Sequence, residues 1–137
     1  MPPDVQSDTL KIGSEDDVVA VRRRVRALAE RLGFDSFATA AVTTATSELT
    51  RNVWMHAGGG EAQVSEMADG PRRGIRIEFR DRGPGIPELE RALAGGYSTR
   101  RSMGLGLAGS RRLVDEFSID TKVGEGTTVR IEKWIRG

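Results

Sequence analysis

Residues 43–60 read TTATSELTRNVWMHAGGG, and this stretch decides the fold. It continues a helical pattern whose apolar residues recur at every fourth position: Phe37, Ala41, Ala45, Leu49 and Val53. The glycines at 58–60 end the pattern, because glycine is unfavourable inside a helix. We therefore expect a helix that begins near Asp35, buries one ridge and carries polar side chains beside it.

A second helix is expected upstream of this one. Ser14 followed by Asp17 resembles a capping box, and the apolar stripe behind it ends near Gly33. The stripe consists of Val18, Val21, Val25, Leu28 and Leu32. Its other face is rich in arginine, which we interpret as a solvated surface; docking of an acidic partner is the alternative. Residues 8–12 fit a short edge strand.

The downstream half of the chain is strand-like. Residues 61–68 and 74–80 fit two strands, and in the second Ile75, Ile77 and Phe79 alternate with charged residues, as in a strand with one wet face. A region rich in glycine and arginine runs from about Arg82 to Gly106. A third helix then extends to about Glu116, and strands at 117–123 and 127–135 close the chain through a hairpin at 124–126.

This order separates helices from antiparallel strands. It predicts an α+β fold, a two-layer α/β sandwich with a mostly antiparallel sheet and helices on one face. The 137 residues suit a single domain over 1–137.

Composition narrows the function. The 21 basic residues nearly balance 20 acidic ones, which argues against a general nucleic-acid binder. There is no cysteine, so disulfides, thiol catalysis and cysteine-based zinc sites are excluded. No apolar run reaches the roughly 18 residues of a membrane helix, and the N-terminus lacks a signal-peptide pattern. We expect a cytoplasmic protein with no membrane partner.

Three polar residues lie along one side of the central helix. Glu48, Asn52 and His56 follow one another at four-residue spacing. The Asn52 oxygen is a hard ligand suited to Mg²⁺, and Glu48 can accept a proton from an attacking hydroxyl. Alternatively, they form the polar flank of an amphipathic helix, because a glutamate four residues before an asparagine is a common pattern.

A second group follows the alternating strand. Asp81 stands at the strand end, where its carboxylate can accept a hydrogen bond from an exocyclic amine such as that of adenine. Gly83 and Gly85 let the backbone approach a flat ligand closely. An ordinary strand-to-loop turn would also favour these residues.

A third group, GLGLAG at 104–109, has the G-x-G-x-x-G spacing. A dinucleotide fingerprint must follow a strand, and the preceding YSTRRS is not one. Glycines that open a helix still offer bare N–H groups to an anion, and Arg100 and Arg101 add positive charge there. Gly126 and Thr127 begin the last strand, where threonine is ordinary.

In this order the groups resemble the boxes of the Bergerat-fold (GHKL) ATPases. Residues 47–52 match the N box, 81–85 the first glycine box and 104–107 the second, and Gly126-Thr127 completes the set. The longer phrases TTATSELTRNVWMHAGGG, DRGPGIPE, GYSTRRSMGLGLAGSRRLVDEFSI and GEGTTVRIEKW resemble the small RsbT-type switch kinases of the stressosome over nearly the whole domain.

The resemblance implies a set of roles for the matching residues. Glu48 would be the general base and Asn52 the Mg²⁺ ligand. Asp81 would accept from adenine, with Thr127 supporting it through water and Gly83 and Gly85 shaping the pocket. The phosphates would meet the second glycine box, which is Gly104, Leu105, Gly106 and Leu107.

Further expectations concern the lid and the partners. Residues 93–103 would form a mobile lid, and from charge and position we expect Arg100 or Arg101 to steady the γ-phosphate. The cofactors implied are ATP and Mg²⁺. The implied substrate is a serine or threonine of a STAS-domain scaffold or antagonist, in a stress-response partner switch. The released kinase would activate a PP2C-type phosphatase; a homodimer is one form that the family allows.

Three other functions compete with this one. A sensor histidine kinase needs a phosphoacceptor histidine on a separate hairpin, but the single histidine, His56, lies in the nucleotide helix. Gyrase-like or Hsp90-like ATPases need further domains. An anti-sigma factor kinase, which sequesters a sigma factor and phosphorylates an antagonist, remains the alternative.

Overall fold

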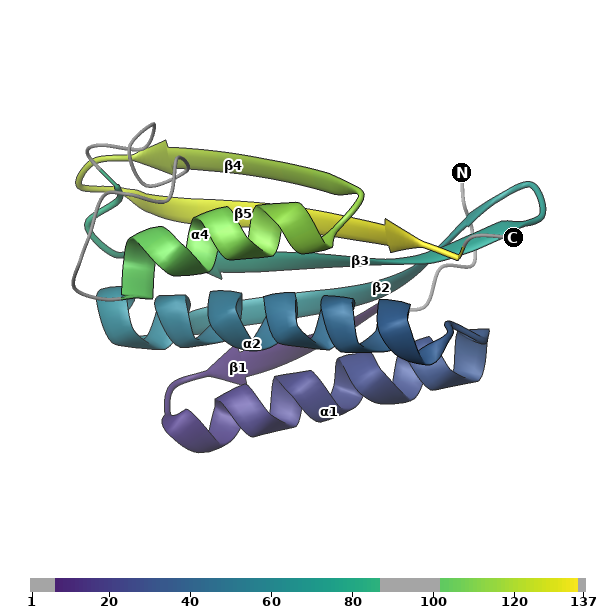
Figure 1. Ribbon diagram of the computed structural model, residues 1–137. Helices are drawn as coiled ribbons and strands as arrows, with labels where there is room; N and C mark the ends of the chain where they lie inside the picture. Colours follow the sequence, from purple (N-terminus) through teal and green to yellow (C-terminus); the bar gives the residue numbers. More distant parts are fainter. Residues whose placement is uncertain (1–6, 87–101, 136–137) are drawn as a thin grey trace.

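The computed structural model describes residues 7–86 and 102–135, with only the backbone of 102–106. The elements follow the expected order (Figure 1). They are β1 (Ser7–Ile12), α1 (Glu15–Leu32), α2 (Ser36–Ala57), β2 (Gly60–Asp69), β3 (Arg72–Asp81), α4 (Ser102–Leu113), β4 (Glu116–Lys122) and β5 (Gly126–Trp134).

The five described strands form one antiparallel sheet in the order β1-β2-β3-β5-β4. The three described helices lie on one face of it, and none of them covers the other face (Figure 1). The core between the layers includes fully buried residues of both: Val21, Val25, Val42, Ile75, Ile77 and Ile131. The predicted α+β fold with helices on one face is confirmed. Among the described residues, no helix is long and apolar enough to span a bilayer.

Local signals explain the boundaries of the two long helices. The Asp35 carboxylate accepts from the Ala38 backbone N–H at 2.7 Å and caps α2. The helix ends at Gly58, whose φ of 79° is the left-handed conformation that glycine adopts easily. Gly33 ends α1 in the same way, with a φ of 92°. Only part of the expected capping box forms, because the Asp17 carboxylate accepts from the Gly13 N–H while Ser14 makes no side-chain cap.

The prediction that Phe37 belongs to the buried apolar ridge of α2 is wrong. Ala45, Leu49 and Val53 are buried, but the side chain of Phe37 is 81% exposed. At 3.6 residues per turn, each four-residue step rotates the position by about 40°. Over the four steps from Val53 back to Phe37 the ridge therefore winds away from the sheet and ends in solvent.

The third helix begins earlier and ends earlier than expected. It starts at Ser102, so Gly104 and Gly106 lie within its first turns, and it stops at Leu113 instead of near Glu116. Leu107 and Ala108 are buried, and this packing outweighs the poor helix propensity of the glycines. Strand pairing sets the C-terminal end of α4, because the Asp115 N–H donates to the Glu132 carbonyl and Glu116 already pairs with β5.

Candidate functional site

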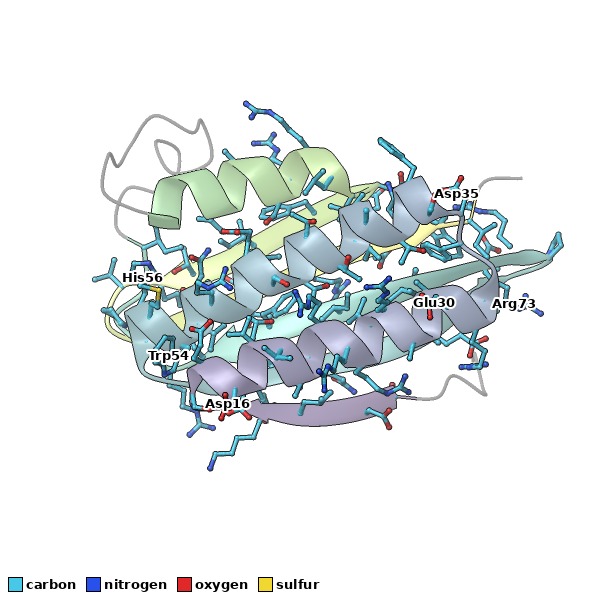
Figure 2. All side chains as sticks on the ribbon, turned by 60° about the horizontal axis from the view of Figure 1, so that its bottom comes forward. Asp16, Glu30, Asp35, Trp54, His56 and Arg73 are labelled. Carbon is cyan, nitrogen blue, oxygen red and sulfur yellow. The ribbon has the colours of Figure 1, made fainter. Side chains whose placement is uncertain are left out.

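A cavity of about 130 Å³ lies between α2, α4 and the ends of β3 and β5. Its walls are largely apolar, and they include Leu49, Val53, Phe79, Ile86, Leu107 and Val129. Four polar side chains also line it: Asn52, His56, Asp81 and Thr127. Asp35 and His56 mark opposite ends of α2 (Figure 2), and the polar lining residues of this helix, Asn52 and His56, both belong to its C-terminal part. An apolar hollow with few polar groups is typical of a small-molecule site.

Asn52 is the polar residue of the helix wall. Its Nδ2 is buried and has no hydrogen-bond partner among the described residues. An unsatisfied buried polar group costs about 1–3 kcal/mol, so the Asn52 Nδ2 is a candidate donor to a ligand in the cavity. The role of Asn52 as a nucleotide-site residue and Mg²⁺ ligand stays a prediction.

Asp81 lies opposite, at the last position of β3. The β3–β5 pairing sets it directly beside Thr127, 46 positions later in the chain. Its Oδ1 accepts from the Gly83 N–H at 2.8 Å, which fixes the carboxylate at the cavity edge. Gly83 has no room for a side chain, since a Cβ there would lie 2.5 Å from the Ala57 Cβ. Gly85 lines the cavity with a φ of 80°.

Thr121 of β4 belongs to the same corner, although no sequence motif predicts a role for it. Its Oγ1 lies 2.8 Å from the Thr127 Oγ1 and accepts from the Ile86 N–H at 3.0 Å. The only sequence signal was its place in a strand, where threonine is common. Its importance arises from the β4–β5 register, which sets Thr121 opposite Thr127.

Gly126 makes this corner possible, and Gly126→Ala should destabilise it. Its φ is 132°, and an added Cβ would collide with the Asp81 carbonyl oxygen. We expect the free energy of unfolding in urea to fall by about 2–5 kcal/mol. Gly124→Ala is the matched control, because Gly124 has a φ of 82° but open space around it; it should lose about 1–2 kcal/mol. Equal losses would show that the close approach to Asp81 does not matter.

Glu48 lies outside this cavity in the described structure. It lines a separate hollow between α1 and α2, together with Arg22, Arg26 and Arg51. Its carboxylate is 3.6 Å from the Arg51 guanidinium, which is also 3.7 Å from Glu15. The side chain of Glu48 is 41% exposed. Asn52 thus faces the cavity while Glu48, one turn earlier, faces the outer hollow.

The remaining predicted residues divide into two groups. Arg100, Arg101 and the greater part of the expected lid lie outside the described residues. Gly104, Leu105 and Gly106 belong to the first turns of α4, and the Leu107 side chain lines the cavity. The structure also adds His56 to the lining, although the sequence analysis assigned it no role.

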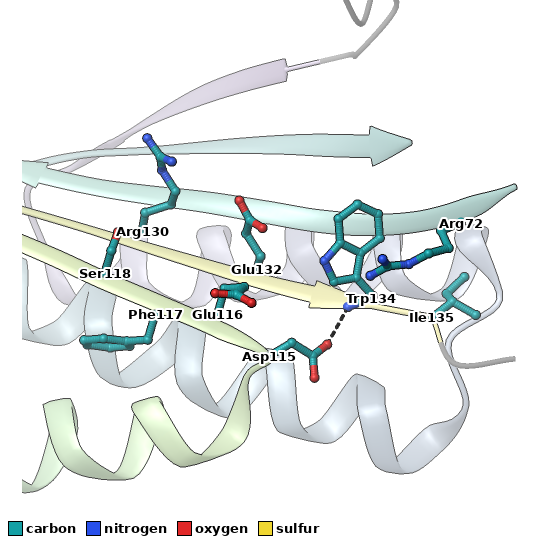
Figure 3. Close-up of a pocket in the computed structure, with 9 residues that line it drawn as sticks. All are labelled: Arg72, Asp115, Glu116, Phe117, Ser118, Arg130, Glu132, Trp134 and Ile135. Atoms are coloured by element: carbon teal, nitrogen blue, oxygen red, sulfur yellow. Dashed lines mark hydrogen bonds between the residues drawn. The ribbon is translucent and has the colours of Figure 1, made fainter. Parts of the chain in front are cut away.

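A larger hollow of about 650 Å³ lies at the open face of the sheet (Figure 3). Several of the side chains that line it interact with neighbouring residues. Glu132 pairs with Arg76 at 2.9 Å, and the Arg72 guanidinium stacks 4.0 Å from the centre of the Trp134 ring. Asp115 accepts from the Trp134 backbone N–H at 2.8 Å. This network stabilises the wet face of the sheet, and the smaller cavity remains the candidate site.

Comparison with known proteins identifies the family. Residues 13–133 match the histidine kinase-like ATPase domain family. The serine/threonine-protein kinase RsbT of Bacillus subtilis (strain 168) is 42% identical over 127 residues, which are 93% of this chain and 96% of that protein. An anti-sigma F factor of Thermoanaerobacter sp. (strain X514) is 30% identical over 100 residues, 69% of this chain and 68% of that protein.

Solved structures share the fold. The RsbU and RsbW domains of Rv1364c from Mycobacterium tuberculosis superpose with a TM-score of 0.66 at 22% identity, covering 99% of this chain and 34% of that one. The mycobacterial sensor histidine kinase MprB gives a TM-score of 0.56 at 18% identity, covering 96% of this chain and 99% of that one. The chain therefore belongs to the histidine kinase-like ATPase domain family and, within it, to the ATP-using serine/threonine-protein kinases of the RsbT type.

Proposed function

We propose that this kinase transfers the γ-phosphoryl group of Mg-ATP to a serine or threonine of a STAS-domain scaffold or antagonist. The reaction would serve a cytoplasmic stress-response partner switch of the stressosome type. The released kinase would then bind and activate a PP2C-type phosphatase. The observation that carries the proposal is that Asn52 and Asp81 line one cavity, where the buried Asn52 Nδ2 has no partner among the described residues. The chain is also 42% identical to RsbT over 93% of its length.

The nucleotide base would enter the apolar part of the cavity. Asp81 would accept a hydrogen bond from the adenine amine, and the Thr127 hydroxyl beside it would act through a water. Gly83 and Gly85 leave the backbone free to approach the ring. The phosphates would extend from Asn52 toward the first turns of α4, whose N–H groups favour anions. Arg100 and Arg101 are proposed to steady the γ-phosphate.

The residues present fit a magnesium ion held largely by its nucleotide. Mg²⁺ bound with ATP takes most ligands from phosphates and water and needs one or two protein oxygens. Asn52 offers one such oxygen at the cavity wall. Among the described residues there is no cluster of three His, Cys, Asp or Glu side chains, the kind of set a self-contained metal cage requires. When bound, the ion would neutralise charge on the phosphates.

Glu48 would act as general base toward the acceptor. In the outer hollow its carboxylate can meet a hydroxyl that arrives from solvent. It would take the hydroxyl proton while the acceptor oxygen bonds the γ-phosphorus and the bond to the ADP oxygen breaks. A rotation of the Glu48 side chain away from Arg51 would bring it toward Asn52.

The decisive test is a phosphotransfer assay. The purified kinase, Mg-ATP and a candidate STAS protein should give phosphoserine or phosphothreonine, located by mass spectrometry. The control is the same STAS protein in which the modified residue and every surface serine and threonine near it are replaced by alanine. Nucleotide binding without transfer to any STAS protein would contradict the proposed substrate class.

A second function is favoured by one observation, the 30% identity to an anti-sigma F factor. The alternative is that the chain sequesters a sigma factor and phosphorylates its antagonist. A pull-down with purified sigma factors separates the two. Tight, nucleotide-dependent capture of a sigma subunit would support the anti-sigma function over the switch kinase.

A further inference from the structure

Strand β4 forms one edge of the sheet. The order β1-β2-β3-β5-β4 gives it β5 as its single described neighbour, and it is the outermost strand on that side (Figure 1). Its sequence, EFSIDTK, contains neither proline nor glycine, and exposed and half-buried residues alternate strictly along it. The edge of such a strand presents a row of backbone N–H and C=O groups with which a further strand can pair. Within the described part of the chain, β4 thus offers a sheet edge to a partner.

The exposed face of β4 carries opposite charges at its two ends. Glu116 is the first residue of the strand and Lys122 the last, and both lie on the same face as Ser118 and Asp120. A second copy of β4 can pair with the first in the antiparallel direction, with the two Ile119 residues on the two-fold axis. Glu116 then faces Lys122 of the second copy, and Ser118 faces Asp120 of the second copy. Each end of the paired strands gains an attractive charge pair.

The neighbouring registers lack this complementarity. A shift by two residues in one direction sets Glu116 against Asp120, and a shift by two in the other direction sets Asp120 against itself. Like charges directly opposite each other are destabilising. A shift by one residue would bring the exposed face of one strand opposite the half-buried face of the other. The charges of β4 therefore favour one register of self-pairing.

The other described edge strand, β1, does not have this pattern. Asp8 and Lys11 are three positions apart, so they point to opposite faces of the sheet and cannot face each other across a two-fold axis perpendicular to it. Asp8 is also paired with the Arg24 guanidinium at 2.6 Å. Charge complementarity therefore favours β4 over β1.

We propose that two copies of this chain associate through antiparallel pairing of their β4 strands, with Glu116 of each copy opposite Lys122 of the other. The two sheets become one continuous sheet, and the helices of both copies lie on the same face. No residue of β4 lines the candidate nucleotide cavity, so both cavities remain accessible. One pair of seven-residue strands is smaller than a standard interface, and the dimer is therefore weak and forms in a concentration-dependent way.

The test is analytical ultracentrifugation over a series of protein concentrations. Glu116→Lys and Lys122→Glu each replace two attractive cross-strand pairs by two repulsive ones, so each should raise the dissociation constant of the dimer about tenfold or more. The exchange variant that carries both substitutions keeps the pairs with their signs reversed and should restore dimerisation. Lys11→Glu, which makes the same charge change on β1, is the matched control and should dimerise like the wild type.

Cross-linking tests the register, because the chain has no cysteine of its own. A mixture of the Ser118→Cys and Asp120→Cys variants should form a disulfide-linked dimer under mild oxidation, since these positions face each other across the axis. Either variant alone should give much less of it, because its cysteine lies opposite a different residue of the second copy.

Three outcomes overturn the inference. Wild-type protein that sediments as a monomer at every concentration would show that β4 does not pair with itself. A dimer that is weakened by Lys11→Glu, but by neither substitution in β4, would place the interface elsewhere. Failure of the exchange variant to restore dimerisation would show that Glu116 and Lys122 do not face each other. None of these results depends on the proposed phosphotransfer.

Discussion

Asp81→Asn is expected to weaken nucleotide binding severely. The carboxylate accepts from the Gly83 N–H and faces an adenine amine in the proposed complex. An asparagine has one acceptor oxygen for these two donors, so one donor would face an NH₂ group. The loss of a hydrogen bond to a charged group, together with two donors facing each other, should reduce the binding free energy by about 3 kcal/mol. This corresponds to roughly a hundredfold loss of affinity. Titration of Mg-ADP by calorimetry measures the change.

The matched control is Asp120→Asn. Asp120 is an exposed residue of β4, one position before Thr121, so the change removes the same charge from the same end of the sheet. Its affinity should equal that of the wild type. If Asp81→Asn binds Mg-ADP within threefold of the wild type, Asp81 is not the adenine acceptor.

Glu48→Gln should separate binding from chemistry. The amide keeps the size of the side chain but cannot take a proton from the acceptor hydroxyl. We expect phosphotransfer to slow about a hundredfold or more, the usual contribution of a general base. The affinity for Mg-ATP should change little, because Glu48 does not line the described cavity. Single-turnover transfer and nucleotide titration on the same preparation give both quantities.

Glu15→Gln is the control for the loss of an ion pair to Arg51. Glu15 and Glu48 both lie near the Arg51 guanidinium, at 3.7 and 3.6 Å, but only Glu48 is on the nucleotide helix. Glu15→Gln should retain transfer within a few-fold. Comparable losses in the two variants would indicate that the ion pairs position Arg51, and that the base lies elsewhere.

The periodic parts of the fold could be predicted from the sequence. Stripes such as Val18–Val25 and the alternation of Ile75, Ile77 and Phe79 report burial directly, and glycine marks the helix ends. Their order was enough for an α+β sandwich with helices on one face. The local pattern was not enough for Phe37, because the drift of a long ridge depends on where the sheet ends.

The site could be predicted only in part. Asn52 and Asp81 carry local motif signals, and both line the cavity. Thr121 carries none, because its contacts with Thr127 and Ile86 depend on the strand order β3-β5-β4, in which β5 is inserted between its neighbours. Pairings between distant segments are not visible in local periodicity. The start of α4 could not be predicted for the same reason. Packing of this helix outweighs the low helix propensity of its glycines, and packing is not visible in the local sequence.

The place of β5 has a consequence for synthesis on the ribosome. The last of the described strands, β5, occupies an interior position of the sheet, between β3 and β4. Until Gly126–Trp134 has emerged, β4 lacks its described strand partner and the cavity lacks Thr127 and Val129. Such long-range pairing closes late in folding. A nascent chain truncated before β5 would therefore lack a complete cavity for the proposed nucleotide. We expect the kinase to bind ATP only after the β4–β5 hairpin has formed.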